Sequence, residues 1–78
     1  MEREEFLKAL DEVVELAPGT LQGQEKLEDL ENWNSMAMLG YIALADTASR
    51  VQLVPRQIRD CDTVDDLLRL AKIGEEGQ

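Results

Sequence analysis

The sequence predicts an all-α fold, a small bundle of three long helices and one short helix. Its length of 78 residues allows one core and leaves no room for a second. A chain of this size buries roughly 60 to 65% of its unfolded surface, which favours helices with mostly local contacts. Apolar residues recur at helical spacing in the first and last segments. We therefore interpret residues 1–78 as a single domain, with residues 74–78 as a frayed tail.

The first helix is expected over residues 2–16. Acidic side chains and Lys8 occupy most of its predicted solvated side, with Asp11 among them. An acid-rich first turn suits the positive end of the helix dipole, and Pro18-Gly19 should end the helix. The opposite stripe is apolar and consists of Phe6, Leu10, Val13, Val14 and Ala17.

The second helix is expected over residues 35–49, after a long connection. Either Asn34 or Ser35 can cap the free amide groups at its start. Apolar residues go almost all the way round this helix, and Asp46 is its only charged residue. A helix of this kind either lies in the centre of the core or keeps one face for a partner.

Two further helices complete the bundle. Pro55 can start a short helix over residues 56–60, because its fixed backbone angle suits the first helical position. The last helix is expected over residues 63–73, since Thr63-Val64-Asp65-Asp66 has the spacing of a capping box and Gly74 stops it. Burial of each large apolar side chain contributes roughly 1.5 to 3 kcal/mol. The predicted core consists of Phe6, Leu10, Val13, Leu39, Ile42, Leu67 and Leu68.

The charge balance excludes several classes of partner. Seventeen acidic and eight basic residues give a formal charge of −9, which repels nucleic acid and anionic lipid and attracts basic protein surfaces. No apolar run approaches the roughly 18 residues of a membrane span, and the N-terminus lacks the pattern of a signal peptide. We expect a cytoplasmic monomer that binds no nucleic acid and does not insert into membranes.

The residue inventory also argues against catalysis. Without histidine, Ser-His and Cys-His nucleophile pairs and the usual zinc sites cannot form. The carboxylates of the first helix are expected in solvent, where nothing separates their pKa values for acid-base work. Residues 60–71 begin like a calcium loop but lack its glycine and its final glutamate. We predict no catalytic residue and no metal site, and interpret Cys61 as a small buried thiol.

One motif remains, Asn34-Ser35-Met36, where the acidic connection meets the apolar helix. A serine at a helix start is exposed and lies at the positive end of the dipole, so it can carry a phosphate group with favourable electrostatics. From these residues alone, the favoured interpretation is that Ser35 or Asn34 is a plain N-cap.

The stretch from Leu27 to Leu70 resembles the acyl carrier proteins, whose phosphopantetheine arm is attached to the serine of an Asp-Ser-Leu motif. That motif is similar to Asn34-Ser35-Met36, preceded here by Trp33 and followed by Ala37-Met38-Leu39, as in free-standing carriers. Val51-Gln52-Leu53 is similar to the short link before the family's third helix. The start of the last helix, Thr63-Val64-Asp65-Asp66-Leu67, is similar to the family's Thr-Val-x-Asp-Leu.

The resemblance implies a carrier protein rather than an enzyme. A phosphopantetheinyl transferase would attach the arm from coenzyme A to Ser35, and acyl-loading and acyl-processing enzymes would then act on cargo held as a thioester. Asn34 stands where the family usually has aspartate, so the amide keeps the capping ability and loses the charge. The second helix also lacks the acidic residues of fatty-acid-synthesis carriers. A specialised lipid or polyketide pathway is therefore the expectation.

Partner docking is expected at the start of the second helix. The residues that we assign to it are Asn34, Met36, Met38 and Leu39. Met38 is the first choice for a contact residue, although a core position is equally compatible with a helix that is apolar all round. The alternative function is a helical protein–protein adaptor of the same fold that is never modified.

Overall fold

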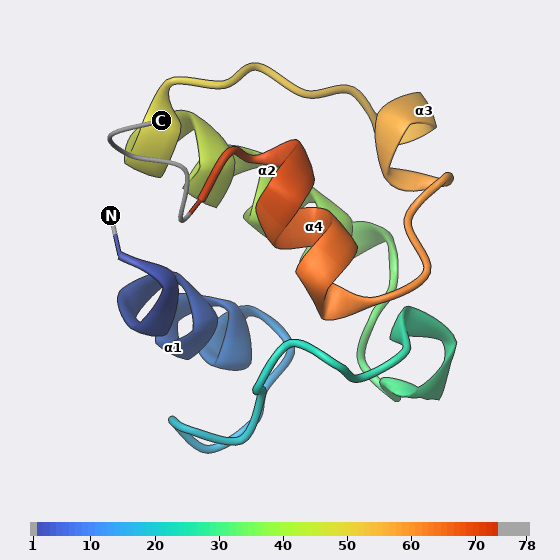
Figure 1. Cartoon of the computed structure of the whole chain (residues 1–78). Coiled ribbons are helices and arrows are strands. Elements are labelled where there is room, and N and C mark those ends of the chain that lie inside the picture. The colour runs from blue at the N-terminus through green and yellow to red at the C-terminus, as the bar shows by residue number, and fades with distance from the viewer. Residues whose placement is uncertain (1, 74–78) are drawn as a thin grey trace.

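The computed structural model describes residues 2–73, and this part of the chain is helical without strands (Figure 1). An isolated antiparallel bridge between Lys26 and Thr63 joins the connection that follows the first helix to the one that precedes the last helix. No helix in the described part is long and apolar enough to cross a membrane. The all-α prediction is confirmed, whereas the predicted stop at Gly74 and the tail of residues 74–78 lie outside the described residues. The elements are α1 (Arg3–Val13), η1 (Leu27–Asp29), α2 (Ser35–Ser49), α3 (Pro55–Ile58) and α4 (Val64–Leu70).

The first helix ends at Val13, earlier than the predicted residue 16. Glu15 adopts a left-handed backbone conformation with φ of 60°. Its N–H donates to the carbonyl of Glu12 at 3.1 Å, and the N–H of Leu16 donates to the carbonyl of Asp11 at 2.7 Å. These two bonds are the Schellman arrangement that satisfies the last carbonyls of a helix. The chain therefore leaves the helix before Pro18-Gly19 is reached.

Replacing Glu15 by glycine should stabilise the protein by about 1 kcal/mol, because a side chain in the left-handed region costs roughly 1 to 2 kcal/mol that glycine avoids. The expected rise in melting temperature is about 4 to 8 °C for a domain of this size. Thermal unfolding followed by circular dichroism measures it. Lys8→Gly, at an exposed position inside α1, should instead destabilise by about 1 kcal/mol. A loss of stability in Glu15→Gly would contradict the left-handed helix end.

Four of the predicted core residues, Phe6, Leu10, Leu67 and Leu68, are confirmed as buried. Val13 and Ile42 are half-buried and pack against the core. Leu39 was assigned to the core, and this prediction is wrong, because 59% of its surface is exposed. Further buried residues extend the core into the connections and include Leu7, Val14, Leu21, Leu27, Tyr41, Leu53, Ile58 and Val64.

The buried face of α2 explains the position of Leu39. Ala37, Tyr41 and Ala45 are buried and follow one another at intervals of four residues, so they form one stripe of the helix. Leu39 lies about 200° round the helix from Ala37, on the opposite side. Because α2 is apolar all round, its sequence pattern does not distinguish the two faces, and the core contacts decide.

α2 contacts both α1 and α4, and Figure 1 shows α4 in front of it. Its approach to α1 depends on Gly40, where a Cβ atom would lie 3.0 Å from Cγ1 of Val13. Its link to α4 is a hydrogen bond of 2.6 Å from the Tyr41 hydroxyl to the carbonyl of Leu67. α2 is thus held on two sides, and its exposed strip includes Met36 and Leu39.

Asp11 is fully buried, whereas helical periodicity predicts it on the solvated side of the first helix. Its carboxylate accepts a hydrogen bond of 2.8 Å from the N–H of Gly19 and one of 2.9 Å from the N–H of Leu21. The connection folds back over α1 and covers this side chain, which is why helical periodicity alone misplaced it. Asp11 therefore attaches the start of the connection to α1.

The start of α4 shows the predicted capping box. The Thr63 hydroxyl accepts from the N–H of Asp66 at 3.2 Å, and the Asp66 carboxylate accepts from the N–H groups of Asp62 and Thr63 at 2.9 and 3.1 Å. These backbone donors hold the pKa of Asp66 below its ordinary value. α4 itself begins at Val64 and ends at Leu70, inside the predicted range of 63–73, and α3 begins and ends earlier than the predicted 56–60.

The connection between α1 and α2 also binds the start of α4, through its backbone carbonyls. The carbonyl of Gly23 accepts from Asp65 N–H at 2.7 Å, and that of Glu25 accepts from Val64 N–H at 3.0 Å. Arg3 pairs with the carboxylate of Asp65 above this contact. A Cβ atom on Gly23 would collide with both side chains, so glycine is required where three segments meet.

Candidate functional site

The start of α2 is capped by Asn34, which answers the question that the sequence left open. The Asn34 side-chain oxygen accepts a hydrogen bond of 3.0 Å from the N–H of Ala37. The carbonyl of Asn34 accepts from the N–H of Met38 at 2.9 Å, which is the first bond of the helix. Asn34 supplies the cap, so the cap does not depend on the hydroxyl of Ser35.

Ser35 is exposed and is the first residue of α2. The N–H groups of Ser35 and Met36 belong to the first turn, where helical geometry provides no carbonyl for them to donate to. These donors and the positive end of the helix dipole surround the Ser35 hydroxyl. The residues present therefore suit a phosphate group attached to this oxygen.

Aromatic side chains support this helix start from beneath. Trp33, two residues before Ser35, is half-buried, and its ring meets that of Tyr41 edge-on at 6.2 Å and 68°. Tyr41 meets Phe6 of α1 in the same way at 6.2 Å and 85°. Burial, with a smaller effect of Cys61, raises the pKa of Tyr41 well above its ordinary value, so the phenol stays protonated and donates to Leu67. The start of α2 consequently rests on packed rings from three segments.

The four predicted docking residues differ in how far they are exposed. Met36 is 77% exposed and Leu39 is 59% exposed, whereas Met38 is half-buried and packs against the core. Asn34 is exposed and makes the cap. Residues three and four apart are neighbours on a helix surface, so Leu39 lies beside both Ser35 and Met36. These three exposed side chains form the candidate site, and Met38, although it is three residues from Ser35, is half-buried and packs against the core.

Acidic side chains lie before this apolar surface in the chain. Glu28, Asp29 and Glu31 are exposed in the connection that leads to Ser35. Residues 35–45 of α2 carry no charge at all. The candidate site is therefore an uncharged strip that adjoins an acidic segment, a surface that suits a partner with an apolar contact region and basic residues near it.

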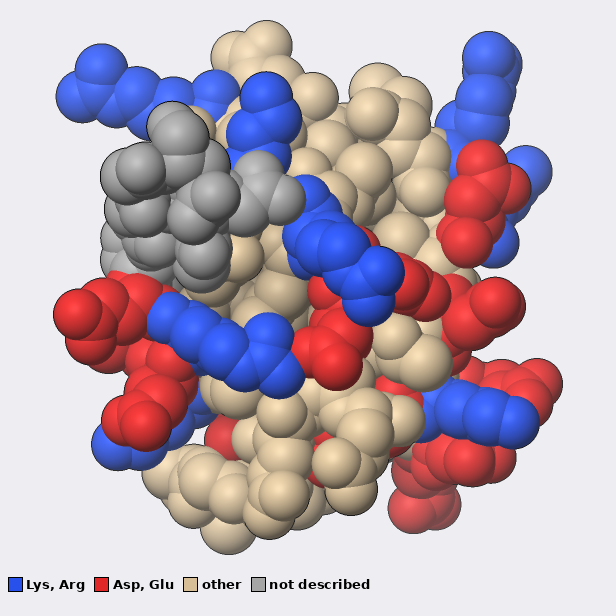
Figure 2. Space-filling view, viewed as in Figure 1, with Lys and Arg blue, Asp and Glu red and all other residues tan. Residues whose placement is uncertain are grey.

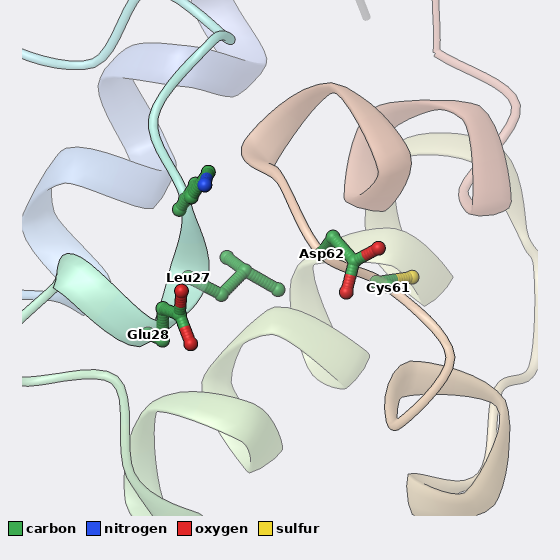
Figure 3. Close-up of a pocket in the computed structure, with 5 residues that line it drawn as sticks. Leu27, Glu28, Cys61 and Asp62 are labelled. Carbon is green, nitrogen blue, oxygen red and sulfur yellow. The ribbon is translucent and has the colours of Figure 1, made fainter.

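A second candidate is a hollow of about 500 Å³ between the connection and the start of α4 (Figure 3). Leu27 and Glu28 line one side, and Cys61 and Asp62 line the other. The Cys61 sulfur points away from Leu27 and Glu28 in this view. Burial, reinforced by the charges of neighbouring aspartates, raises the pKa of the Cys61 thiol. A protonated thiol without a base is a poor nucleophile, so this hollow does not have the chemistry of a catalytic site.

The raised pKa predicts slow alkylation of Cys61. At neutral pH the folded protein should react with iodoacetamide more slowly than the same chain unfolded in guanidinium chloride, because less of its thiol is ionised and part of it is buried. The difference should narrow as the pH rises and the thiol ionises. Rates from pH 6 to 10 measured by intact mass test this, and Cys61→Ser gives the background. A folded protein that reacts faster at pH 7 would contradict the assignment.

Sequence reasoning missed two features of this region. Tyr41 was noted only as one of many apolar residues of α2, and its fixed place in the core depends on contacts with other elements. Val54 is 54% exposed in the link before α3, and neither periodicity nor motif singled it out. Within residues 2–73, no three Cys, Asp or Glu side chains lie close enough together to hold a metal ion.

Comparisons with protein families, with curated proteins and with solved structures find no match to this chain. Its own residues are therefore the basis for a functional conclusion.

Proposed function

We propose that the chain is an acyl carrier protein, which carries acyl intermediates as thioesters on a phosphopantetheine arm attached to Ser35. A phosphopantetheinyl transferase would load the arm from coenzyme A, and acyl-processing enzymes of a specialised pathway in the cytoplasm would act on the cargo. In this proposal the protein is a substrate of its partners and not an enzyme. The arm supplies the thiol that holds the acyl group, so Cys61 has no part in the chemistry.

The observation that carries this proposal is the exposed hydroxyl of Ser35 beside a cap that Asn34 already provides. A serine needed for the cap would tie up its oxygen in the helix start, whereas here the oxygen is available as an acceptor for a transferred group. The same position is the one that the resemblance to acyl carrier proteins selects. Two independent arguments therefore lead to the same atom.

The arm fits the first turn of α2. Its phosphodiester would lie against the N–H groups of Ser35 and Met36. The uncharged surface of Met36 and Leu39 next to the attachment point suits an enzyme that must approach the arm closely. Asn34 places no negative charge beside the phosphodiester, unlike the aspartate usual in the family, and this removes one repulsion at the cost of a carboxylate that can assist the transferase.

Intact mass spectrometry tests the proposal directly. After incubation with coenzyme A, magnesium and a broad-specificity transferase, wild type should gain the mass of one phosphopantetheine group. Ser35→Ala should remain folded by circular dichroism and gain nothing, because the acceptor oxygen is absent. Ser49→Ala is the matched control on the same helix and should be modified like wild type. A wild type that stays unmodified with several transferases, or a modified Ser35→Ala, would refute the assignment.

The second candidate is an unmodified adaptor that binds a protein partner through α2. The exposure of Met36 and Leu39 on a helix start favours it, since large apolar side chains in solvent mark interaction surfaces when they lie together. The same mass measurement separates the two functions. An adaptor gains no mass with any transferase.

A further inference from the structure

The segment of residues 47–59 differs in charge from the rest of this acidic protein. It contains Arg50, Arg56 and Arg59 and no acidic residue, and all three arginines are exposed. The ion pairs described within residues 2–73 use Arg3 and Arg69 instead. In residues 2–34, by contrast, acidic side chains outnumber basic ones. The chain therefore has a local positive region in spite of its net charge of −9.

An exposed apolar side chain lies within this positive region. Val54 is 54% exposed, and its backbone is fixed by two bonds of 3.0 Å, from Val54 N–H to the side-chain oxygen of Gln57 and from Gln57 N–H to the carbonyl of Val54. Pro55 follows as the first residue of α3 and restricts the turn further. The Val54 backbone is thus set by the turn before any partner arrives. We call Arg50, Val54, Arg56 and Arg59 the basic edge.

The figures show where the segment that carries the basic edge lies on the molecule. The link from α2 to α3 runs along the upper side of Figure 1, with the end of α2 at one corner and α3 at the other. In the same view, Figure 2 shows Lys and Arg side chains at both upper corners with uncharged surface between them. Acidic side chains lie mainly in the middle and lower parts of this face. Basic side chains are therefore the more numerous charged groups along the upper side of this view, although an acidic one adjoins them at the right.

We propose that the basic edge is a second docking surface, and that its partner is a protein with an acidic patch around a small apolar contact. Carboxylates of the partner pair with the arginine guanidinium groups, which suit bidentate contacts, and Val54 packs into the apolar centre. Arginine is enriched at the energetically important positions of protein interfaces. The local positive charge of the three arginines orients the molecule during encounter, so an acidic partner meets this edge and not the acidic parts of the surface.

The partner class follows from the size and setting of the patch. Nucleic acid and anionic membranes are extended polyanions, and the net charge of −9 repels them over the whole surface while three arginines offer few phosphate contacts. A second copy of the chain carries the same net charge and is repelled for the same reason. A protein with a local acidic patch but without a large net negative charge avoids this repulsion. The proposal is independent of whether Ser35 carries an arm.

The test uses the full chain labelled with ¹⁵N and a synthetic peptide of repeated Glu-Glu-Leu as the probe. Amide shift changes should be confined to residues 50–59, and the peptide with Gln in place of Glu should bind at least about tenfold more weakly. Arg50→Glu, Arg56→Glu and Arg59→Glu combined should reduce the affinity by at least about tenfold. Val54→Ala, which leaves the charge unchanged, should reduce it by about threefold or more.

The matched control combines Lys8→Glu, Lys26→Glu and Lys72→Glu, which change the net charge by the same amount at exposed positions elsewhere. This variant should keep most of the affinity, and Ser35→Ala should keep all of it. Equal losses in the two triple variants would overturn the site, as would equal binding of the Gln peptide or shifts outside the basic edge. The proposal is also overturned if phosphatidylserine vesicles, an oligonucleotide or self-association perturb these amides and the acidic peptide does not. Circular dichroism confirms that each variant is folded.

Discussion

Leu39→Glu should slow the modification of Ser35 by at least about fivefold while leaving the protein folded. Leu39 is exposed one helical turn from Ser35, so any enzyme that reaches the hydroxyl must contact it or pass close to it. A charge placed there removes an apolar contact and leaves a carboxylate to be desolvated, a loss of about 1 to 3 kcal/mol for a residue near the centre of an interface. That range corresponds to roughly 5- to 150-fold in kcat/KM. The rate of mass gain with a single transferase measures the effect.

The control for this prediction is Thr47→Glu, another exposed position about two turns further along α2. It adds the same charge and should change kcat/KM by less than about threefold. Met38→Glu is a poorer test, because Met38 packs against the core and a buried carboxylate would lower stability as well. Equal kcat/KM for Leu39→Glu and wild type would show that docking does not use this face. The assay presupposes that wild type is modified, so a failure of docking and a failure of the carrier function give different results.

The parts of the fold that could be predicted depend on local interactions. α2 covers the predicted residues 35–49. This range could be predicted because Asn34 and Ser35 are both suitable caps and no proline interrupts the residues that follow. The capping box of Thr63 and Asp66 was likewise readable, because both partners lie within one turn. A signal of this kind needs no knowledge of what packs against the helix.

The parts that could not be predicted depend on contacts between distant segments. The burial of Asp11 results from a connection that folds back over α1, which helical periodicity cannot express. The early end of α1 at Val13 uses Glu15 in a conformation that normally indicates glycine, so the sequence signal pointed further along to Pro18-Gly19. In α2 the apolar residues occupy every side, so the choice between Tyr41 and Leu39 as the buried residue was undetermined.

Some features of the candidate site could likewise be predicted from the sequence, and others required the structure. The motif located Ser35 and predicted that it is exposed at a helix start, and the structure agrees. The assignment of the cap to Asn34 required the side-chain geometry, since either residue was chemically suitable. The support beneath the site required the tertiary structure, because Phe6, Trp33 and Tyr41 come from three separate segments.

Tyr41→Ala should destabilise the protein by about 3 to 5 kcal/mol, the range for removing a large aromatic side chain from a core. Its ring is fully buried between Phe6 and Trp33, and its hydroxyl joins α2 to the carbonyl of Leu67. A domain of this length has a total stability of roughly 4 to 12 kcal/mol, so the variant should lose much of its cooperative unfolding transition. Urea denaturation followed by circular dichroism measures the change.

Two further variants identify which part of Tyr41 is responsible. Tyr41→Phe keeps the ring and removes one hydrogen bond, and it should cost only about 1 to 2 kcal/mol because the carbonyl of Leu67 still accepts from the N–H of Ala71. Leu39→Ala truncates an exposed residue of the same helix and should change stability by less than about 0.5 kcal/mol. If Tyr41→Ala behaved like Leu39→Ala, the buried face of α2 would be assigned incorrectly, and the exposure of Met36 and Leu39 beside Ser35 would no longer follow. The change in unfolding free energy caused by Tyr41→Ala therefore tests the orientation of α2, and the proposed carrier site depends on that orientation.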